Sequence, residues 1–169
     1  DLVKLDEEFE DVTEDQETKT KLKGEWSRVE AIVCSDNRIK QLAKDIVNHF
    51  EQRTNVMDGK GMIVCMSRSI CVQLHNEIQK LKPNWVNKED DKGLLKVIMT
   101  GSASDGPDWQ QHIRNKERRK HLADIFKDTT SEFKLAIVRD MWLTGFDAPS
   151  LHTLYIDKPM KGHGLMQAI

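Results

Sequence analysis

The stretch that decides the fold reads Ile137-Val138-Arg139-Asp140-Met141-Trp142-Leu143-Thr144-Gly145-Phe146-Asp147-Ala148-Pro149-Ser150. It begins as an apolar strand, turns at Thr144-Gly145 and carries the acid Asp147 just after the turn. Ligands of parallel α/β sheets bind at the carboxyl ends of the strands. The turn offers a hydroxyl, a backbone that a ligand can approach closely and a carboxylate, which are groups that nucleotide and phosphate sites use.

Strands and helices alternate around this stretch. Apolar runs predict strands at 62–66, 94–99, 134–138 and 151–156, and apolar residues at helical spacing predict helices over 36–50, 70–81 and 109–126. This alternation predicts an α/β fold with a doubly wound, mostly parallel sheet of about four strands, right-handed crossovers and helices on both faces.

Charge divides the chain into an acidic extension and a basic remainder. The 169 residues carry a net charge of −2, but residues 1–17 alone carry −8, which leaves +6 on the rest. We therefore expect an acidic linker or extension over 1–24, N-terminal helices over 25–55 and the main domain over 56–169. The extension is expected to be either a solvated linker or a segment that folds onto something absent. The chain stops inside a starting helix, so we expect a fragment.

Cysteine, histidine and hydropathy patterns narrow the class of protein. The three cysteines form no CxxC pair and no apolar leader precedes them, which favours a reducing compartment and buried free thiols. No apolar run approaches the roughly 20 residues of a membrane span. The histidines lack the spacing of a zinc site, so no metal ligand is assigned. We expect a soluble, cytoplasmic protein without a membrane partner.

Three predicted strands end in small or basic polar loops. These loops are Ser67-Arg68, Thr100-Gly101 and Thr144-Gly145. Each alone is an ordinary turn, but parallel strands bring their carboxyl ends to one edge of the sheet, where hydroxyls, backbone amides and a guanidinium together hold phosphate. The sequence therefore predicts a site for a phosphate-rich ligand at this edge.

A basic segment supplies a second candidate surface. Five cations crowd the predicted third helix, at Arg114, Lys116, Arg118, Arg119 and Lys120. Such a patch binds a nucleic-acid backbone, and an ordinary solvated helix face explains it equally well. Trp109 and Trp142 are candidates either for stacking on bases or for anchoring the core. The sequence contains no GxxxxGK[ST] phosphate loop.

The run from Arg139 through Thr144-Gly145-Phe146-Asp147-Ala148-Pro149 to Gly162-His163-Gly164-Leu165-Met166-Gln167-Ala168-Ile169 closely resembles the second helicase-like motor domain of the restriction (R, HsdR) subunit of type I restriction enzymes. Gly61-Met62-Ile63-Val64-Cys65-Met66-Ser67-Arg68 resembles motif IV of that family, and Leu5-Asp6-Glu7-Glu8-Phe9 also looks similar. The resemblance covers nearly the whole chain. The strand-Thr-Gly-x-Asp turn is shared by superfamily 2 helicases generally, whereas the extended run is specific.

The resemblance implies a RecA-like fold and an ATP-driven translocase of double-stranded DNA, joined to a nuclease domain. By position, it implies contacts with DNA or with the interdomain cleft for Ser67 and Arg68, and a DNA contact for Thr144. The meeting of the three loops adds Thr100 to the predicted DNA contacts, and the basic segment is a further candidate. It implies ATP binding or coupling for Gly145, Asp147 and Gln167. The implied partners are duplex DNA, the methylation and specificity subunits and the first RecA-like domain, and that first domain mainly holds ATP and Mg²⁺.

The 169-residue chain lacks the phosphate loop and the arginines that the family places after Gln167. Since phosphoryl transfer depends on charge positioned around the γ-phosphate, we expect no bound cofactor, no catalytic residue and no ATPase or nuclease activity in the isolated chain. Two alternatives stay open at this point. One is the equivalent domain of another superfamily 2 DNA or RNA helicase, and the other is a stand-alone α/β binding module.

Overall fold

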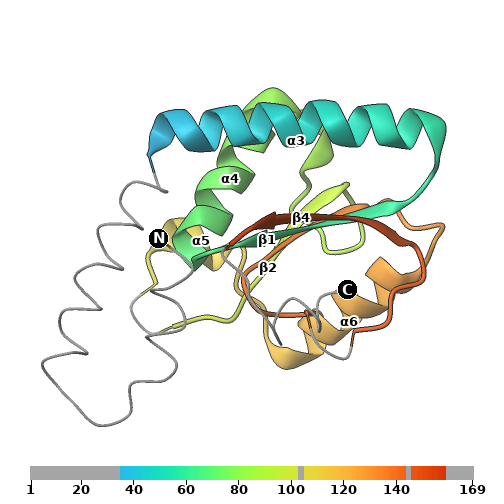
Figure 1. Cartoon of the computed structure of the whole chain (residues 1–169). Helices are drawn as coiled ribbons and strands as arrows, with labels where there is room; N and C mark the ends of the chain where they lie inside the picture. The colour runs from blue at the N-terminus through green and yellow to red at the C-terminus, as the bar shows by residue number, and fades with distance from the viewer. Residues whose placement is uncertain (1–34, 103–104, 144–145, 159–169) are drawn as a thin grey trace, which may run out of the picture.

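Four parallel strands form the centre of the molecule (Figure 1). The computed structural model describes residues 35–102, 105–143 and 146–158. The strands are β1 (Lys60–Cys65), β2 (Leu95–Ile98), β3 (Leu135–Val138) and β4 (Leu151–Asp157), and their order across the sheet is β2-β3-β1-β4. Ile63 of β1 pairs with Ile137 of β3 and with Tyr155 of β4. The predicted parallel α/β sheet of four strands is confirmed.

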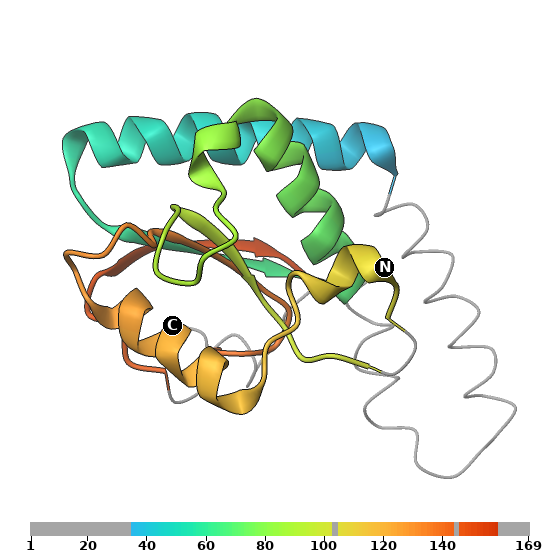
Figure 2. The ribbon, with the colours of Figure 1, turned by 180° about the vertical axis from the view of Figure 1, so that it is seen from behind.

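Helices cover both faces of this sheet. They are α3 (Asp36–Val56), α4 (Arg68–Leu81), the short 3₁₀ turn η1 (Pro83–Trp85), α5 (Pro107–Gln110) and α6 (Lys116–Lys127). Figures 1 and 2 show α3 and α4 on one face and α6 on the other. This is the doubly wound arrangement expected of an α/β, RecA-like fold.

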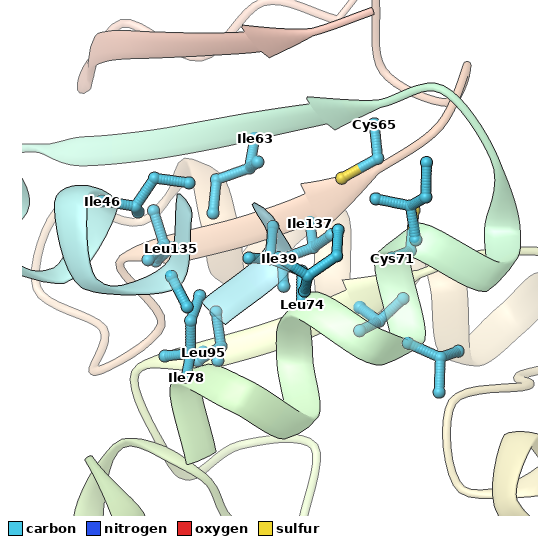
Figure 3. Close-up of a cluster of buried hydrophobic side chains, with 14 of the residues drawn as sticks. Ile39, Ile46, Ile63, Cys65, Cys71, Leu74, Ile78, Leu95, Leu135 and Ile137 are labelled. Carbon is cyan, nitrogen blue, oxygen red and sulfur yellow. The ribbon is translucent and has the colours of Figure 1, made fainter. Parts of the chain in front are cut away.

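The alternation of strand side chains produces two hydrophobic cores. Ile63 and Ile137 pack towards α3 and α4, where the apolar stripe of α3 and Leu74 and Ile78 of α4 meet them (Figure 3). Met62 and Val138 face the other way, towards Leu122 and Phe126 of α6. Because both faces are covered, β1 is buried at every position, as its unbroken apolar run predicts.

The free thiols lie in the first core. Cys65 on β1 and Cys71 on α4 are both buried and unoxidised (Figure 3). A hydrogen bond with Cys71, together with burial, raises the pKa of the Cys65 thiol well above its ordinary value. The expectation of buried free thiols is confirmed for these two, and Cys34 lies outside the described residues.

The helix predicted over 109–126 is wrong in its first part. The chain forms the short α5, then an extended segment in which Ile113 bridges Met99 beyond the end of β2, and only then α6. Asn115 caps α6, since its side chain accepts a hydrogen bond from the Arg118 amide at 2.8 Å. Ile113 packs against the core from an extended position and not from a helix.

Strand β1 also begins earlier than its apolar run indicates. Lys60 is the first residue of the strand and only 1% exposed. Its ammonium donates to the carbonyls of Ile125 and Asp128 and to the Ser131 hydroxyl, which compensates the burial of the charge. Burial nevertheless lowers the pKa of Lys60 to about 8. The predicted helix before Cys34 lies outside the described residues.

Candidate functional site

The carboxyl edge of the sheet gathers two of the three predicted loops. Ser67 follows β1 and Thr100 follows β2. Arg68 joins the two loops, because its guanidinium donates to the Thr100 carbonyl at 2.7 Å. Ser67 also caps α4, with its hydroxyl oxygen accepting from the Ile70 amide at 3.3 Å. The expected convergence of these two loops is therefore present, whereas Thr144 lies outside the described residues.

Arg68 makes several of its hydrogen bonds within the chain itself. Its two terminal nitrogens contact the two carboxylate oxygens of Asp105 at 2.9 and 2.6 Å. Asp105 in turn accepts from the Ser102 amide at 2.6 Å. The hydrogen bonds from Arg68 lower the pKa of Asp105, so the carboxylate stays ionised. Arg68 therefore stabilises the loop after β2. The prediction of Arg68 as a DNA contact did not include this structural role.

The Arg68 side chain is 24% exposed and its Asp105 partner 3% exposed. Trp109 of α5 also contacts Arg68, since the guanidinium lies over the indole with 5.1 Å to the ring centroid. α5 lies beside the start of α4 in both views (Figures 1 and 2). Asp105 is a residue of this site that sequence reasoning missed, because a loop aspartate carries no periodic signal.

The segment after β3 is held by stacked aromatic rings. Trp142 adopts a φ of 67°, a backbone conformation that residues with side chains rarely take. Its ring stacks on Phe146 with centroids 4.5 Å apart and planes 4° from parallel, and Phe126 of α6 packs beside both. Of the two alternatives for Trp109 and Trp142, these contacts favour anchoring over base stacking.

The positions expected near ATP are described only in part. Asp147 is exposed, while Gly145 and Gln167 lie outside the described residues. A single exposed carboxylate does not compose a nucleotide site. No step of ATP hydrolysis can be assigned to the described residues, and the ATP-coupling roles of Gly145, Asp147 and Gln167 stay predictions.

The basic segment does not form the continuous surface patch that its sequence indicates. Arg114 is buried, and its Nε donates to Asp90 at 2.7 Å while one terminal nitrogen donates to the carbonyls of Val97 and His112 at 3.1 Å. Arg118 donates to the second oxygen of Asp90 at 2.7 Å. Arg114 is therefore corrected from a surface cation to an interior one, because a distant aspartate compensates its charge.

The other cations of the segment differ in exposure. Lys116, Arg118 and Lys120 are exposed on α6, and Arg119 is partly exposed and donates to the Arg114 carbonyl. These four side chains remain the candidates for contact with a nucleic-acid backbone. These cations lie on α6, and the other candidates lie on the edge loops. The structure therefore has two separate candidate surfaces for nucleic acid.

The described residues form neither a metal-binding cluster nor a helix suited to a membrane. Within 35–102, 105–143 and 146–158, no three His, Cys, Asp or Glu side chains gather where they could hold a metal ion. None of the helices in that part of the chain combines the length and apolar character needed to cross a bilayer.

Comparison with known proteins decides the family. Residues 6–169 match the model of a family described as type I restriction enzyme subunit R domain 3. The chain belongs to this family. The R-subunit match covers the whole sheet and the edge loops, so the site described above is a feature of a restriction-enzyme domain.

Curated relatives agree with the R-subunit family. The type I restriction enzyme HindI endonuclease subunit of Haemophilus influenzae is 51% identical over 140 residues, which make up 83% of this chain and 13% of that protein. The putative type I restriction enzyme MjaIXP endonuclease subunit of Methanocaldococcus jannaschii is 41% identical over 98% of this chain and 16% of its own length. The chain thus spans a small part of each relative.

Proposed function

We propose that this chain is the second RecA-like motor domain of an ATP-dependent translocase of double-stranded DNA within a type I restriction endonuclease subunit. The observation that carries the proposal is the meeting of the Ser67 and Thr100 loops at the carboxyl edge, joined by Arg68. In parallel α/β sheets this edge is where ligands bind. The family match favours this reading over an unrelated helicase domain or a stand-alone module.

Each edge residue has a distinct role in the proposal. The hydroxyls of Ser67 and Thr100 donate to DNA phosphates, as does Thr144 in the loop after β3. Arg68 holds the loop through Asp105 and presents its exposed portion to the backbone. Asp147 couples the loop after β3 to nucleotide held mainly by the first motor domain, which supplies most contacts to ATP and Mg²⁺. Methylation and specificity subunits complete the complex, and the DNA sequence is recognised outside this domain.

The exposed cations of α6 supply a second contact in the proposal. Lys116, Arg118, Arg119 and Lys120 neutralise phosphates of the duplex and release counterions. Replacing one such lysine lowers the slope of log affinity against log salt by about 1 without changing sequence preference. The binding of a short duplex measured over a salt series, with wild type and Lys116→Gln, tests this part.

The decisive experiment uses the intact restriction subunit and the Thr100→Ala variant. Loss of one hydrogen bond to phosphate slows DNA-dependent ATP hydrolysis about two- to tenfold. Thr129→Ala is the matched control, because Thr129 is also exposed but lies in the loop after α6. Equal rates for Thr100→Ala and Thr129→Ala would remove Thr100 from the DNA site.

A second pair of variants tests coupling to the nucleotide. Asp147→Asn removes the charge of the exposed acid after the turn, and Asp124→Asn removes an exposed charge on α6. Asp147→Asn should reduce translocation at unchanged duplex affinity, and Asp124→Asn should leave both unchanged. Wild-type translocation in Asp147→Asn would contradict the proposed coupling role.

A further inference from the structure

A cavity of about 270 Å³ opens on the flank of the sheet beside β2. Its walls come from His75 of α4, Lys88, Lys96 of β2, His112, Arg114 and Arg118 of α6. Figure 2 shows the yellow-green segment between η1 and β2 passing in front of β2, with α4 above it and α6 below it. The cavity is separate from the edge loops of Ser67 and Thr100, since neither loop lines it.

The lining of the cavity is strongly basic. Lys88, Lys96, Arg114 and Arg118 all line it, and no Asp or Glu of the described residues does so. Asp90 compensates two of these cations, because it accepts from the Nε atoms of Arg114 and Arg118 at 2.7 Å each, and Asp91 and Glu132 also act on Lys96. One carboxylate thus faces two guanidinium groups, and the cavity keeps an excess of positive charge.

The cations divide into fixed and available donors. The Lys96 ammonium donates to the carbonyls of Asn87, Glu89 and Lys92, at 3.4, 2.7 and 2.6 Å, so it contributes charge more than free donors. Arg118 uses its Nε on Asp90, and its side chain is 53% exposed. Among the described residues, the terminal nitrogens of Arg118 and the exposed Lys88 ammonium have no acceptor. They can therefore donate to a ligand.

His112 provides an observation independent of charge. It is 4% exposed, it lines the cavity, and its Nε2 has no hydrogen-bond partner among the described residues. A buried polar atom without a partner costs about 1–3 kcal/mol, so such atoms normally contact a ligand or water. The ring of His75 packs edge-on against His112 with centroids 4.5 Å apart.

The imidazoles are neutral before a ligand arrives. Burial, with the nearby His75 and Arg114, lowers the pKa of His112 to about 3. Burial likewise lowers the pKa of His75, against the opposing effect of the hydrogen bond to the Asn76 side-chain oxygen. Both imidazoles therefore line the cavity without adding positive charge to it.

The size of the cavity limits the ligand. Drug-sized ligands occupy about 300–1,000 Å³, and one water takes about 30 Å³ of liquid volume. A volume of about 270 Å³ therefore admits a small oxyanion with a few waters.

We propose that this cavity binds a single phosphate-type oxyanion, held by Arg118 and Lys88 beside the buried His112 and Arg114. The site is separate from the edge loops, but it shares Arg118 with the cations of α6 that the proposed function places on DNA. The phosphate group is either free inorganic phosphate or one phosphate of a DNA backbone, and the experiment below separates these sources.

The test titrates the 169-residue chain with inorganic phosphate at constant ionic strength, and follows the imidazole signals of His75 and His112 by NMR. The His112→Asn and His75→Asn variants assign the signals. Phosphate should shift the His112 signal with a dissociation constant on the order of 1 mM. It should also raise the pKa of His112, because an anion stabilises the imidazolium.

Two cavity variants and one matched control give the test its specificity. Lys88→Gln and Arg118→Gln should each weaken phosphate binding about threefold to tenfold, since each removes a charge-assisted hydrogen bond. Lys44→Gln removes an exposed charge from α3, which contributes no residue to the cavity, and should leave the affinity unchanged. Circular dichroism checks that all three variants are folded.

The remaining outcomes either assign the source or overturn the proposal. Competition of a short DNA duplex with phosphate for the His112 shift would support the site and assign the phosphate to a DNA backbone. Phosphate binding without competition would support a free ion. A His112 signal that does not move with phosphate, or that moves equally with chloride or equally in Lys44→Gln and Lys88→Gln, means that only water fills the cavity and overturns the site.

Discussion

Two arginine–aspartate pairs stabilise different regions of the molecule, and they differ chiefly in how deeply the arginine is buried. At the carboxyl edge, Arg68 is 24% exposed and meets Asp105 through both terminal nitrogens. Beside β2, Arg114 is 6% exposed and meets Asp90, which also binds Arg118. The first arginine keeps a face towards solvent, while the second is enclosed by the core.

This difference in burial separates a functional surface from a structural support. An arginine with an exposed face can exchange an internal acceptor for a phosphate at modest cost, because water replaces what is lost. A buried arginine that loses its carboxylate is left as an uncompensated charge in a medium of low polarity. The same pair of residue types therefore supports a candidate binding surface in one region and the folded core in the other.

The largest expected effect is that of Asp90→Ala. Removing this carboxylate leaves Arg114 buried and unpaired, which should lower the free energy of unfolding by about 3 kcal/mol. Urea denaturation measures the change. Asp91→Ala is the matched control, because Asp91 is the adjacent acid with a side chain 71% exposed, and should change stability by less than about 0.5 kcal/mol. Similar losses in both variants would contradict the buried role of Asp90.

A smaller effect is expected of Arg68→Ala. Asp105 keeps the Ser102 amide as a donor after Arg68 is removed, and the loss of the partly exposed Arg68 side chain admits water to the carboxylate that it covered. The loss should be about 1 kcal/mol in the same urea experiment. Arg139→Ala provides the comparison, since Arg139 is 52% exposed and its contact with Asp140 is expected to contribute almost nothing. A loss for Arg68→Ala as large as that for Asp90→Ala would abolish the distinction between the two pairs.

The smallest expected effect is a dependence of the stability difference on pH in the acidic range. Arg68 holds the folded pKa of Asp105 below its ordinary value of 3.8, so the pair contributes fully above pH 3.8. Its contribution is lost as pH falls through the lower folded value. The stability difference between wild type and Arg68→Ala should therefore shrink below pH 3.8, measured by urea titrations at several pH values. A difference that stays constant into strong acid would show that packing on Trp109, and not charge, accounts for Arg68.

The parts of the fold predicted from sequence are those that local spacing determines. The apolar stripe from Ile39 to Phe50 predicted α3, and the unbroken run Met62–Met66 predicted a strand buried on both faces. The meeting of Ser67 and Thr100 followed from parallel strands sharing a carboxyl edge. These inferences need only neighbours in the chain or the direction of the strands.

The parts that failed depend on partners far away in the chain. Arg114 looked like a surface cation because its neighbours are basic, yet Asp90 compensates it from 24 residues earlier. Ile113 looked like part of a helix face, but its bridge to Met99 holds it extended. Lys60 stood outside the predicted strand 62–66, and its three acceptors come from 65 to 71 residues later. No periodic pattern carries such information.

The position of Arg114 beside β2 has a consequence for self-association. Its guanidinium occupies the Val97 carbonyl, and Ile113 bridges Met99 just past the strand end. These contacts leave β2 with fewer free backbone groups for a foreign strand. Within the described sheet, lateral growth by intermolecular pairing is therefore expected at β4, on the opposite border, before it is expected at β2.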